Sequence, residues 1–292
     1  MSDITTLVGK GRPALDMFLD PNSFQENRIG EFIQEPNLGQ TAVIGTGTLN
    51  GRLLTVITTD AKIRNPRFPV VMAGVIGLEE AYKMATAVYQ TIEADRHNAT
   101  KRPLLLLVDT PGNAPGKVEE MFGMNCATGA YQLALAEARQ QGHPVVAMII
   151  GRAISGAFLC HGLQADRILS LPKSFGTMIH VMPLNGIARI TKMDVERLEA
   201  LSETNPVFAS GASFFYQLGG VEEVVSQIGD IPAAIDKHLT EVYALNAQGL
   251  SHTLGPWGRG ELGNQRGGRT KRHQVLTLIS EQFAAIETEL LA

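Results

Sequence analysis

The amino-acid sequence predicts an α/β fold whose β-sheet is at least partly parallel. Two stretches with the same layout lead to this prediction, because each has an apolar run, then a glycine-rich turn, and then a segment with helical spacing. The first turn is Asp109–Gly116 (DTPGNAPG), which follows Leu104–Val108, and the second is Gly151–Phe158 (GRAISGAF), which follows Val145–Ile150. Strands that alternate with helices in this way run parallel, since each helix returns the chain to the start of the next strand.

A pair of strands is expected before these two units. Thr41–Thr48 and Leu53–Thr59 are joined by a turn that contains Asn50-Gly51, which is a strong hairpin signal. A third apolar run, Val70–Ile76, is weakened as a strand by its internal glycine. The repeating unit therefore looks like two strands and a helix, and residues 1–40 give no firm prediction.

The first helices are predicted from the spacing of their apolar residues. Leu78–Ile92 carries apolar residues three or four positions apart. Met121–Gln141 is a longer segment rich in alanine and leucine, and Gly142 follows it at the C-cap position. A short helix is expected over Gly156–Leu163, directly after the second glycine-rich turn.

The prediction is coarser after this short helix. Arg167–Ser170 and Thr177–Val181 are expected to be strands. From there to Leu245 the chain is expected to be mainly helical, with breaks at Asn205-Pro206 and Gly219-Gly220.

The C-terminal part is expected to add a loop and a helix to the core. Gly249–Gly268 is rich in glycine and is expected to be a loop, and Lys271–Leu291 is expected to be an amphipathic helix. We therefore predict a single domain over residues 1–292, with its core at about 41–245 and the loop and helix at 249–292.

The composition excludes several classes of protein. The chain has 292 residues, of which 44 % are hydrophobic and 18 % are charged, and this is typical of a globular domain with a full core. The net charge of −4 argues against nucleic-acid binding, which depends on neutralising phosphates. No apolar run approaches the ~20 residues of a membrane helix, so no membrane partner is expected. The N-terminus has no signal-peptide pattern, so a cytoplasmic location is expected.

The first glycine-rich turn has two interpretations. Prolines at 111 and 115 stiffen it, while its glycines permit positive φ angles or a close approach of the backbone. It is either one wall of a binding slot for an extended ligand, or a wide connection without a ligand. The candidate binding residues are Gly112, Asn113, Ala114 and Gly116.

The second turn predicts an oxyanion hole. The backbone N–H groups of Gly156 and Ala157 lie in the first helical turn, where they lack intrahelical acceptors and are reinforced by the helix dipole. The alternative is that Ser155 is a plain N-cap. A serine nucleophile is disfavoured, because alanines at 153 and 157 replace both glycines of the G-x-S-x-G pattern. The candidate catalytic residues are therefore Ser155, Gly156 and Ala157.

Other reactive side chains are expected to be structural. Cys126 and Cys160 are interpreted as small buried residues, and the seven histidines form no close metal-ligand set, so no metal is expected. His161 is interpreted as packed or solvated, although it follows the turn closely enough to approach the site. Asp166-Arg167 is favoured as a structural ion pair.

The basic tail is the last candidate site. Arg266 and Arg269 lie among glycines, near further basic residues at 271–273. Such a run is either a solvated face or a patch for phosphate or an acidic partner.

The two turns together resemble a known family. DTPGNAPG, a long helix, a strand and then ISGAF resemble the carboxyltransferase branch of the crotonase superfamily. Relatives often carry two glycines where Ser155-Gly156-Ala157 has one. More closely, the chain from about Thr41 to the tail is similar to the gamma subunits of biotin-independent malonate decarboxylase. Val181–Thr191 (VMPLNGIARIT), Asn205–Gly211 (NPVFASG) and the Gly-Arg-rich tail support that similarity.

The resemblance implies a fold and an activity. The fold would be the crotonase-like ββα superhelix with extra C-terminal helices. With a homologous beta subunit, the chain would decarboxylate a malonyl thioester on an acyl carrier protein to an acetyl thioester and CO2. The carrier arm would be a phosphoribosyl-dephospho-CoA group, which the basic tail could grip. An alpha subunit would exchange acetyl for malonyl, and this chain would bind no cofactor itself.

Two alternatives and one assignment stay open. The chain could pass the carboxyl group to a biotin carrier, or it could be a non-catalytic scaffold for the beta subunit. Decarboxylation leaves an enolate, which needs fixed donors at an oxygen and no metal. Because the resemblance makes this chain the carrier-side half, the amides of Gly156 and Ala157 face either the enolate oxygen or the carboxyl or biotin oxygen.

Overall fold

Most strands of the protein form one mixed sheet. The computed structural model describes residues 5–182, 184–204 and 210–290. In sheet order, the strands are β1 (Gln25–Glu26), β4 (Ala42–Leu49), β5 (Arg52–Thr59), β6 (Leu104–Thr110), β7 (Val145–Ile154), β8 (Arg167–Ser170) and β10 (Glu223–Val224), and β9 (Met178–His180) also pairs with β7. A separate antiparallel pair is made of β2 (Arg28–Ile29) and β3 (Phe32–Ile33).

The strand directions confirm the predicted sheet. β4 and β5 form an antiparallel hairpin whose turn residues Asn50 and Gly51 both have positive φ, at 50° and 75°. β5, β6, β7, β8 and β10 are parallel to one another, as is β9 to β7. The glycine-rich turns therefore follow two neighbouring parallel strands, and both lie at the carboxyl edge of the sheet.

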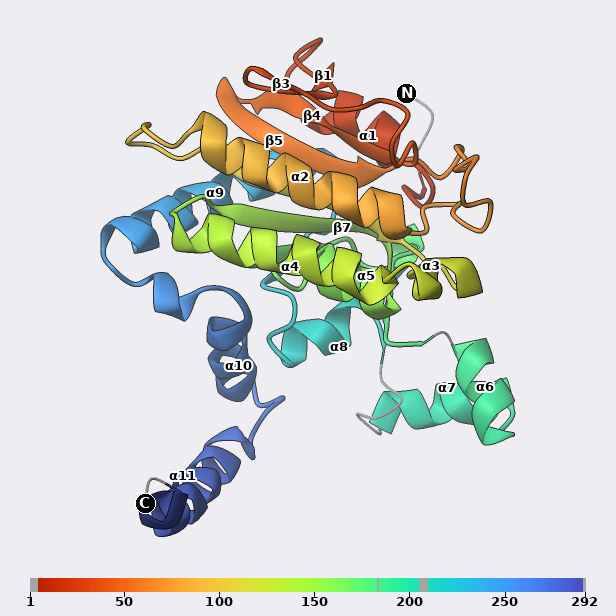
Figure 1. Ribbon diagram of the computed structural model, residues 1–292. Helices are drawn as coiled ribbons and strands as arrows, with labels where there is room; N and C mark the ends of the chain where they lie inside the picture. The colour runs from red at the N-terminus through yellow and green to blue at the C-terminus, as the bar shows by residue number, and fades with distance from the viewer. Residues whose placement is uncertain (1–4, 183, 205–209, 291–292) are drawn as a thin grey trace.

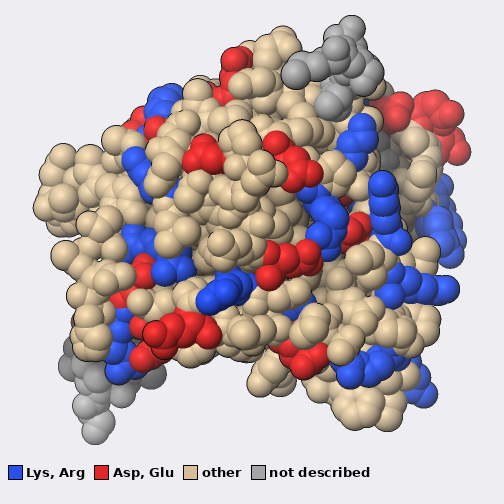
Figure 2. Space-filling view, turned by 90° about the horizontal axis from the view of Figure 1, so that it is seen from above, with Lys and Arg blue, Asp and Glu red and all other residues tan. Residues whose placement is uncertain are grey.

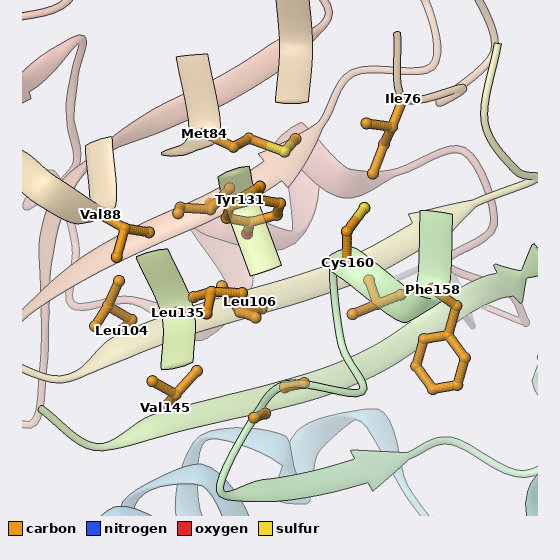
Figure 3. Close-up of a cluster of buried hydrophobic side chains, with 14 of the residues drawn as sticks. Ile76, Met84, Val88, Leu104, Leu106, Tyr131, Leu135, Val145, Phe158 and Cys160 are labelled. Atoms are coloured by element: carbon orange, nitrogen blue, oxygen red, sulfur yellow. The ribbon is translucent and has the colours of Figure 1, made fainter. Parts of the chain in front are cut away.

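Helices cover both faces of the sheet (Figure 1). α2 (Leu78–Ala94), α4 (Met124–Gln140) and the short α5 (Ser155–Cys160) pack on one face, and Figure 3 shows part of the cluster between them and the strands. α1 (Gly11–Phe18) and α9 (Ile231–Ala247) pack on the other face.

Because helices cover both faces of the sheet, every residue of β6 is buried, which explains its unbroken apolar sequence. Leu104, Leu106 and Val108 point to the α2–α4 side, whereas Leu105 and Leu107 point to the α1–α9 side. All seven residues of β6 are buried.

The remaining helices lie after or beside this core. They are α3 (Lys117–Met121), α6 (Leu184–Thr191), α7 (Val195–Thr204), α8 (Ala212–Gln217), α10 (Gly255–Gln265) and α11 (Arg272–Leu290), with short 3-10 turns at Lys173–Phe175, Ile228–Asp230 and Ser251–Thr253. The helix predicted over Lys271–Leu291 is thus confirmed for its described residues. The break predicted at Asn205-Pro206 and most of the NPVFASG segment lie outside the described residues. In the part of the chain with coordinates, no helix combines the length and apolar character needed to cross a bilayer.

One element prediction is wrong, and one apolar run forms no strand. Val70–Ile76, which its internal glycine weakens as a strand, has φ angles of 56° and 88° at Ala73 and Gly74, and only isolated bridges form there. The loop predicted over Gly249–Gly268 contains α10, whose glycines permit close packing. A side chain on Gly263, for example, would overlap the carbonyl oxygen of Leu218. Glycine here therefore serves contact between elements, which local propensity does not report.

A buried arginine attaches α10 to the body. Arg259 is 5 % exposed, and its Nη1 donates to the carbonyl oxygen of Ala165 at 2.6 Å while its Nη2 donates to that of Leu163. The carboxylate of Glu222 lies 4.0 Å away and is itself buried. The charge is thus compensated inside the protein, as a buried guanidinium requires.

Candidate functional site

The two glycine-rich turns meet at the carboxyl ends of β6 and β7. A Cβ placed on Gly112 would lie 3.8 Å from the Cβ of Ser155, and one placed on Gly156 would lie 2.7 Å from Oδ1 of Asn113. Gly112 has a φ of 138°, a conformation that other residues rarely adopt. The fold thus brings together two motifs that are about forty residues apart in the sequence.

Ser155 has an unusual backbone conformation. It is the first residue of α5, and its φ of 59° lies in the left-handed region, which costs a non-glycine residue about 1–2 kcal/mol. The N-cap position belongs to Ile154, and no side chain caps the helix. The interpretation of Ser155 as a plain N-cap is therefore wrong.

The amides of Gly156 and Ala157 are candidate donors. Both lie in the first turn of α5, and neither has an acceptor among the residues with described positions. Ser155 is exposed and Gly156 is half-buried, so this end of the helix is reached from solvent, while Ala157 and Phe158 are buried behind it.

Asn113 lies directly over Gly156. Its Oδ1 is buried and has no hydrogen-bond partner within the described chain. Ile76 braces the turn from behind, because its N–H donates to Gly112 O at 3.1 Å and its carbonyl accepts from Ala114 N at 3.0 Å. Ala114 is buried, and at Gly116 a side chain would overlap the Glu119 carboxylate. Between Pro111 and Gly116 the turn is therefore a rigid wall, and Asn113 is the polar side chain of that stretch.

An ion pair that the sequence analysis missed fixes both turns. Asp109 is 1 % exposed, and its carboxylate accepts hydrogen bonds from the N–H groups of Gly9 (2.7 Å) and Arg152 (2.8 Å). It also accepts from Nε and Nη2 of Arg152, each at 2.9 Å. Arg152 Nη2 also donates to Ala73 O at 2.8 Å. An acid at the end of a fully apolar run was the available signal, because a buried carboxylate needs partners.

The other reactive side chains differ partly from expectation. Cys160 is buried, and its burial raises the pKa of the thiol to about 12, which confirms a structural role. Cys126 is exposed, so the prediction that it is buried is wrong. Asp166 pairs with Arg139 at 2.5 Å and not with Arg167, because β8 directs Arg167 away toward Glu241. Among the residues of the described ranges, no group of His, Cys, Asp or Glu could hold a metal.

His161 is packed inside the core and not at the site surface. It is fully buried, and its Nε2 lies 3.1 Å from Leu107 O while its Nδ1 lies 3.0 Å from the hydroxyl of Tyr131. Burial lowers the pKa of His161 to about 4. The imidazole is therefore neutral at pH 7.

We expect this histidine to make the protein less stable in acid. The folded state holds His161 with a pKa of about 4 against an ordinary 6.5, so the unfolded chain binds more protons between these values. The free energy of unfolding should therefore rise with pH through this window and level off above it. Urea titrations at several pH values should show a smaller rise for His161→Gln than for the wild type. Equal slopes would contradict a depressed pKa.

The arginines of the tail are used inside the protein. Arg266 Nη1 donates to Tyr216 O (2.7 Å) and Val221 O (2.8 Å), its Nη2 donates to Glu222 O (2.9 Å), and the guanidinium stacks on the Tyr216 ring at 3.6 Å. Arg269 Nε donates to Leu218 O at 2.7 Å. Figure 1 shows α10 on the opposite side of the body from α3. Arg266 would have to break these bonds to reach a carrier phosphate.

Removing Arg266 should loosen the C-terminal helices. Arg266→Ala deletes three hydrogen bonds to carbonyl groups and a ring contact, and we expect a loss of about 2–3 kcal/mol in stability. Hydrogen exchange should accelerate in α10 and α11 first. Lys271→Ala is the matched control, because Lys271 is exposed and, among the residues with coordinates, its side chain bonds only to Gln274. Equal exchange in the two variants would contradict the docking role.

The surface charge agrees with the composition. Figure 2 views the molecule from above β1 and β3, and on this face acidic and basic side chains are interspersed. The visible face therefore has no continuous basic stripe of the kind that nucleic-acid binding uses.

Comparison with known proteins gives the class and the family. A mainly parallel sheet covered on both faces, with two glycine-rich turns meeting at its carboxyl edge, is the architecture of crotonase-like carboxyltransferase subunits. This confirms the predicted fold class. The chain belongs to the malonate decarboxylase gamma-subunit family, whose model matches residues 72–283.

Three relatives illustrate the match. The malonyl-S-ACP:biotin-protein carboxyltransferase MADD of Malonomonas rubra is 60 % identical over 288 residues, which cover 98 % of this chain and 99 % of the relative. A Pseudomonas malonate decarboxylase hetero-tetramer, solved with coenzyme A, contains a similar chain with 33 % identity and a TM-score of 0.69, covering 85 % of this chain and 94 % of that one. Transcarboxylase 12S shares the fold, with 22 % identity and a TM-score of 0.64 over 83 % of this chain and 42 % of that one.

Proposed function

We propose that this chain is a subunit of a malonyl-S-ACP:biotin-protein carboxyltransferase. The observation that carries the proposal is the 60 % identity, over nearly the full length of both proteins, to the Malonomonas rubra protein of that name. Identity to the Pseudomonas decarboxylase chain is 33 %. The higher identity supports biotin-dependent transfer over biotin-independent decarboxylation, which the sequence analysis put first.

The proposed reaction balances without a metal or a redox step. The bond between the carboxyl carbon and C2 of the malonyl thioester breaks, and its electron pair forms the enolate of the acetyl thioester. The ureido nitrogen of biotin loses its proton and forms a bond to the carboxyl carbon. That proton is equivalent to the one gained by the enolate carbon, so the products are an acetyl thioester and carboxybiotin.

The amides of Gly156 and Ala157 are assigned to an oxygen that gains negative charge. Both amides are in the first turn of α5 and lack acceptors within the described chain, and the turn at Ser155 orients them before any ligand binds. A preorganised donor of this kind is typically worth about 3 kcal/mol of barrier. We place the ureido oxygen of biotin there, because deprotonation of the ureido nitrogen moves charge onto that oxygen.

The first turn is assigned as the wall of the same slot. Asn113 supplies a polar side chain to this wall, and Gly112, Ala114 and Gly116 have little or no side chain that would fill the slot. We propose that the second subunit closes the slot and binds the malonyl thioester on its acyl carrier protein. Supporting this, the related Pseudomonas enzyme is a hetero-tetramer.

Biotin-independent decarboxylation is the second candidate. The family model is that of malonate decarboxylase gamma subunits, and the same two amides could hold the enolate oxygen. In this case water or an acid protonates the enolate, and CO2 leaves free.

One experiment separates these candidates. Malonyl-charged carrier protein, labelled in its free carboxyl group, is incubated with this chain and its beta partner, with and without a biotin carrier and avidin. We expect label on the biotin carrier and none after avidin is added. Free labelled CO2 that is insensitive to avidin would favour the decarboxylase instead. An assembled complex that gives neither product would reject both and leave a scaffold role.

A further inference from the structure

The buried pair His161 and Tyr131 is the strongest feature that the proposed chemistry does not use. Neither side chain is exposed, and both lie in the layer between the sheet and the helices α4 and α5 (Figure 3 labels Tyr131 there). Polar groups in such a place are costly unless they are hydrogen-bonded, so their bonds have a structural consequence.

Chemistry determines which ring nitrogen of His161 carries the proton. Nε2 lies 3.1 Å from Leu107 O, and a carbonyl oxygen can only accept, so Nε2 is the protonated nitrogen. Nδ1 is then an acceptor, and the Tyr131 hydroxyl donates to it at 3.0 Å. One imidazole therefore joins α4 to β6 through a single tautomer.

These bonds span the two turns of the site. Leu107 is five residues before Gly112 in the first turn, and His161 is five residues after Gly156 in the second. The N–H of His161 also donates to Ala157 O at 2.8 Å, which completes the last turn of α5. The bond between Leu107 O and the imidazole is thus a second link between the segments that carry the two turns, besides the Asp109–Arg152 pair.

On the side of β5, the ladder of β6 ends just before this point, while its pairing with β7 continues to Thr110. The last pair of the ladder between β5 and β6 is Ile57 with Leu106. Leu107 O accepts instead from Thr58 Oγ1 at 2.9 Å and from His161 Nε2. On this side of β6, side-chain bonds therefore follow the last ladder pair with β5.

We propose that His161 is a positioning residue, which uses its Nε2–H bond to Leu107 O to hold the amides of Gly156 and Ala157 in register with the Asp109–Gly116 turn. The inference rests on the proposed function, since it assigns the bond a role in turnover. It does not make His161 a catalytic residue, because the ring is fully buried and reaches no substrate.

Two conservative variants separate the two bonds of the imidazole. In His161→Gln the amide nitrogen of the new side chain can reach the place of Nε2, so this variant keeps the donor to Leu107 O. The shorter side chain of His161→Asn keeps only an acceptor near Nδ1. We expect His161→Gln to retain kcat within about threefold, and His161→Asn and His161→Leu to lose about tenfold or more, with KM for the carrier within about twofold. Tyr131→Phe leaves the Leu107 bond in place and should lose about threefold or less.

The chain offers a matched control at the other end of the sheet. His143 is also unexposed, and its Nδ1 lies 2.8 Å from Arg102 O, just before β6 and β7 begin. His143→Leu removes the same kind of bond, from an imidazole nitrogen to a backbone carbonyl, at the amino ends of β6 and β7 and far from the turns. We expect a similar loss of Tm and an unchanged kcat. Equal kcat losses in His143→Leu and His161→Leu would reduce His161 to a stability role and overturn the proposal.

A second readout does not depend on turnover. Amide spectra of nitrogen-15-labelled protein should show altered shifts and faster exchange at Gly156 and Ala157 in His161→Asn, but not in His161→Gln or His143→Leu. If the wild-type complex is inactive, the proposed function fails. The amide spectra of the variants still test whether His161 positions the two amides. The proposal would be overturned if the amide shifts and exchange of Gly156 and Ala157 were unchanged in His161→Asn. It would also be overturned if kcat were low in His161→Gln but normal in His161→Asn.

Discussion

Replacing Gly156 by proline is expected to lower kcat of the assembled enzyme by about 10²–10³-fold without unfolding it. Proline lacks the N–H, so one of the two proposed donors disappears. The second residue of a helix accepts proline, because its N–H has no intrahelical acceptor. Gel filtration and circular dichroism would establish assembly and fold, and single-turnover transfer from malonyl-charged carrier would give the rate.

A pair of alanine variants separates the loss of the donor from crowding. Gly156→Ala keeps the N–H but places a methyl group 2.7 Å from Asn113 Oδ1, so Asn113 has to move. The double variant Gly156→Ala with Asn113→Ala keeps both amides and removes the contact. We expect its kcat to match that of Asn113→Ala within about threefold. A proline variant as fast as the wild type would remove Gly156 from the mechanism.

Replacing Asp109 by alanine should give the largest loss of stability. The substitution leaves Arg152 without its countercharge and leaves the N–H groups of Gly9 and Arg152 without their acceptor. Breaking a buried ion pair from one side typically costs about 3–5 kcal/mol. Urea unfolding monitored by circular dichroism measures this directly. A loss below about 1 kcal/mol would show that the pair is not needed.

Asp95 provides the control for Asp109. It is equally buried and accepts from Arg102 N (2.6 Å), Arg102 Nη2 (3.0 Å) and Asn98 Nδ2 (3.0 Å), but it lies at the amino end of β6. Asp95→Ala should destabilise by a similar amount and leave kcat of the folded enzyme unchanged. Asp109→Ala should lower both, because Arg152 also holds Ala73 beside the first turn. Adding Arg152→Met to Asp109→Ala should recover part of the stability, since no unpaired charge remains.

Local patterns in the sequence predicted the elements that build the sheet. The apolar runs of β6 and β7, the Asn50-Gly51 hairpin and the glycine-rich turns each depend on neighbours within a few residues. Their order along the chain predicted a partly parallel sheet with each turn directly after a strand, and the motifs themselves were specific enough to indicate the family.

Non-local contacts account for what the sequence analysis missed. Asp109 pairs with Arg152, which is 43 positions away in the sequence. Asp166 pairs with Arg139 at a separation of 27 positions, and Arg266 bonds to Tyr216 at a separation of 50. No local pattern encodes such pairs, because charged side chains choose partners by spatial proximity after the backbone has folded. The glycines of α10 belong to the same class, since their value lies in contact with other elements.

The sequence by itself determined the α/β class, the place of each glycine-rich turn directly after a strand, and the family. Only the tertiary structure decided that Ser155 is a strained entry to α5, that Asn113 lies over Gly156, and that His161 is a buried neutral link and not a surface histidine. The physical reason is the sequence separation of the residues that interact. Periodicity and turn chemistry act over a few residues, whereas burial and hydrogen-bond geometry depend on which distant segments the fold brings into contact.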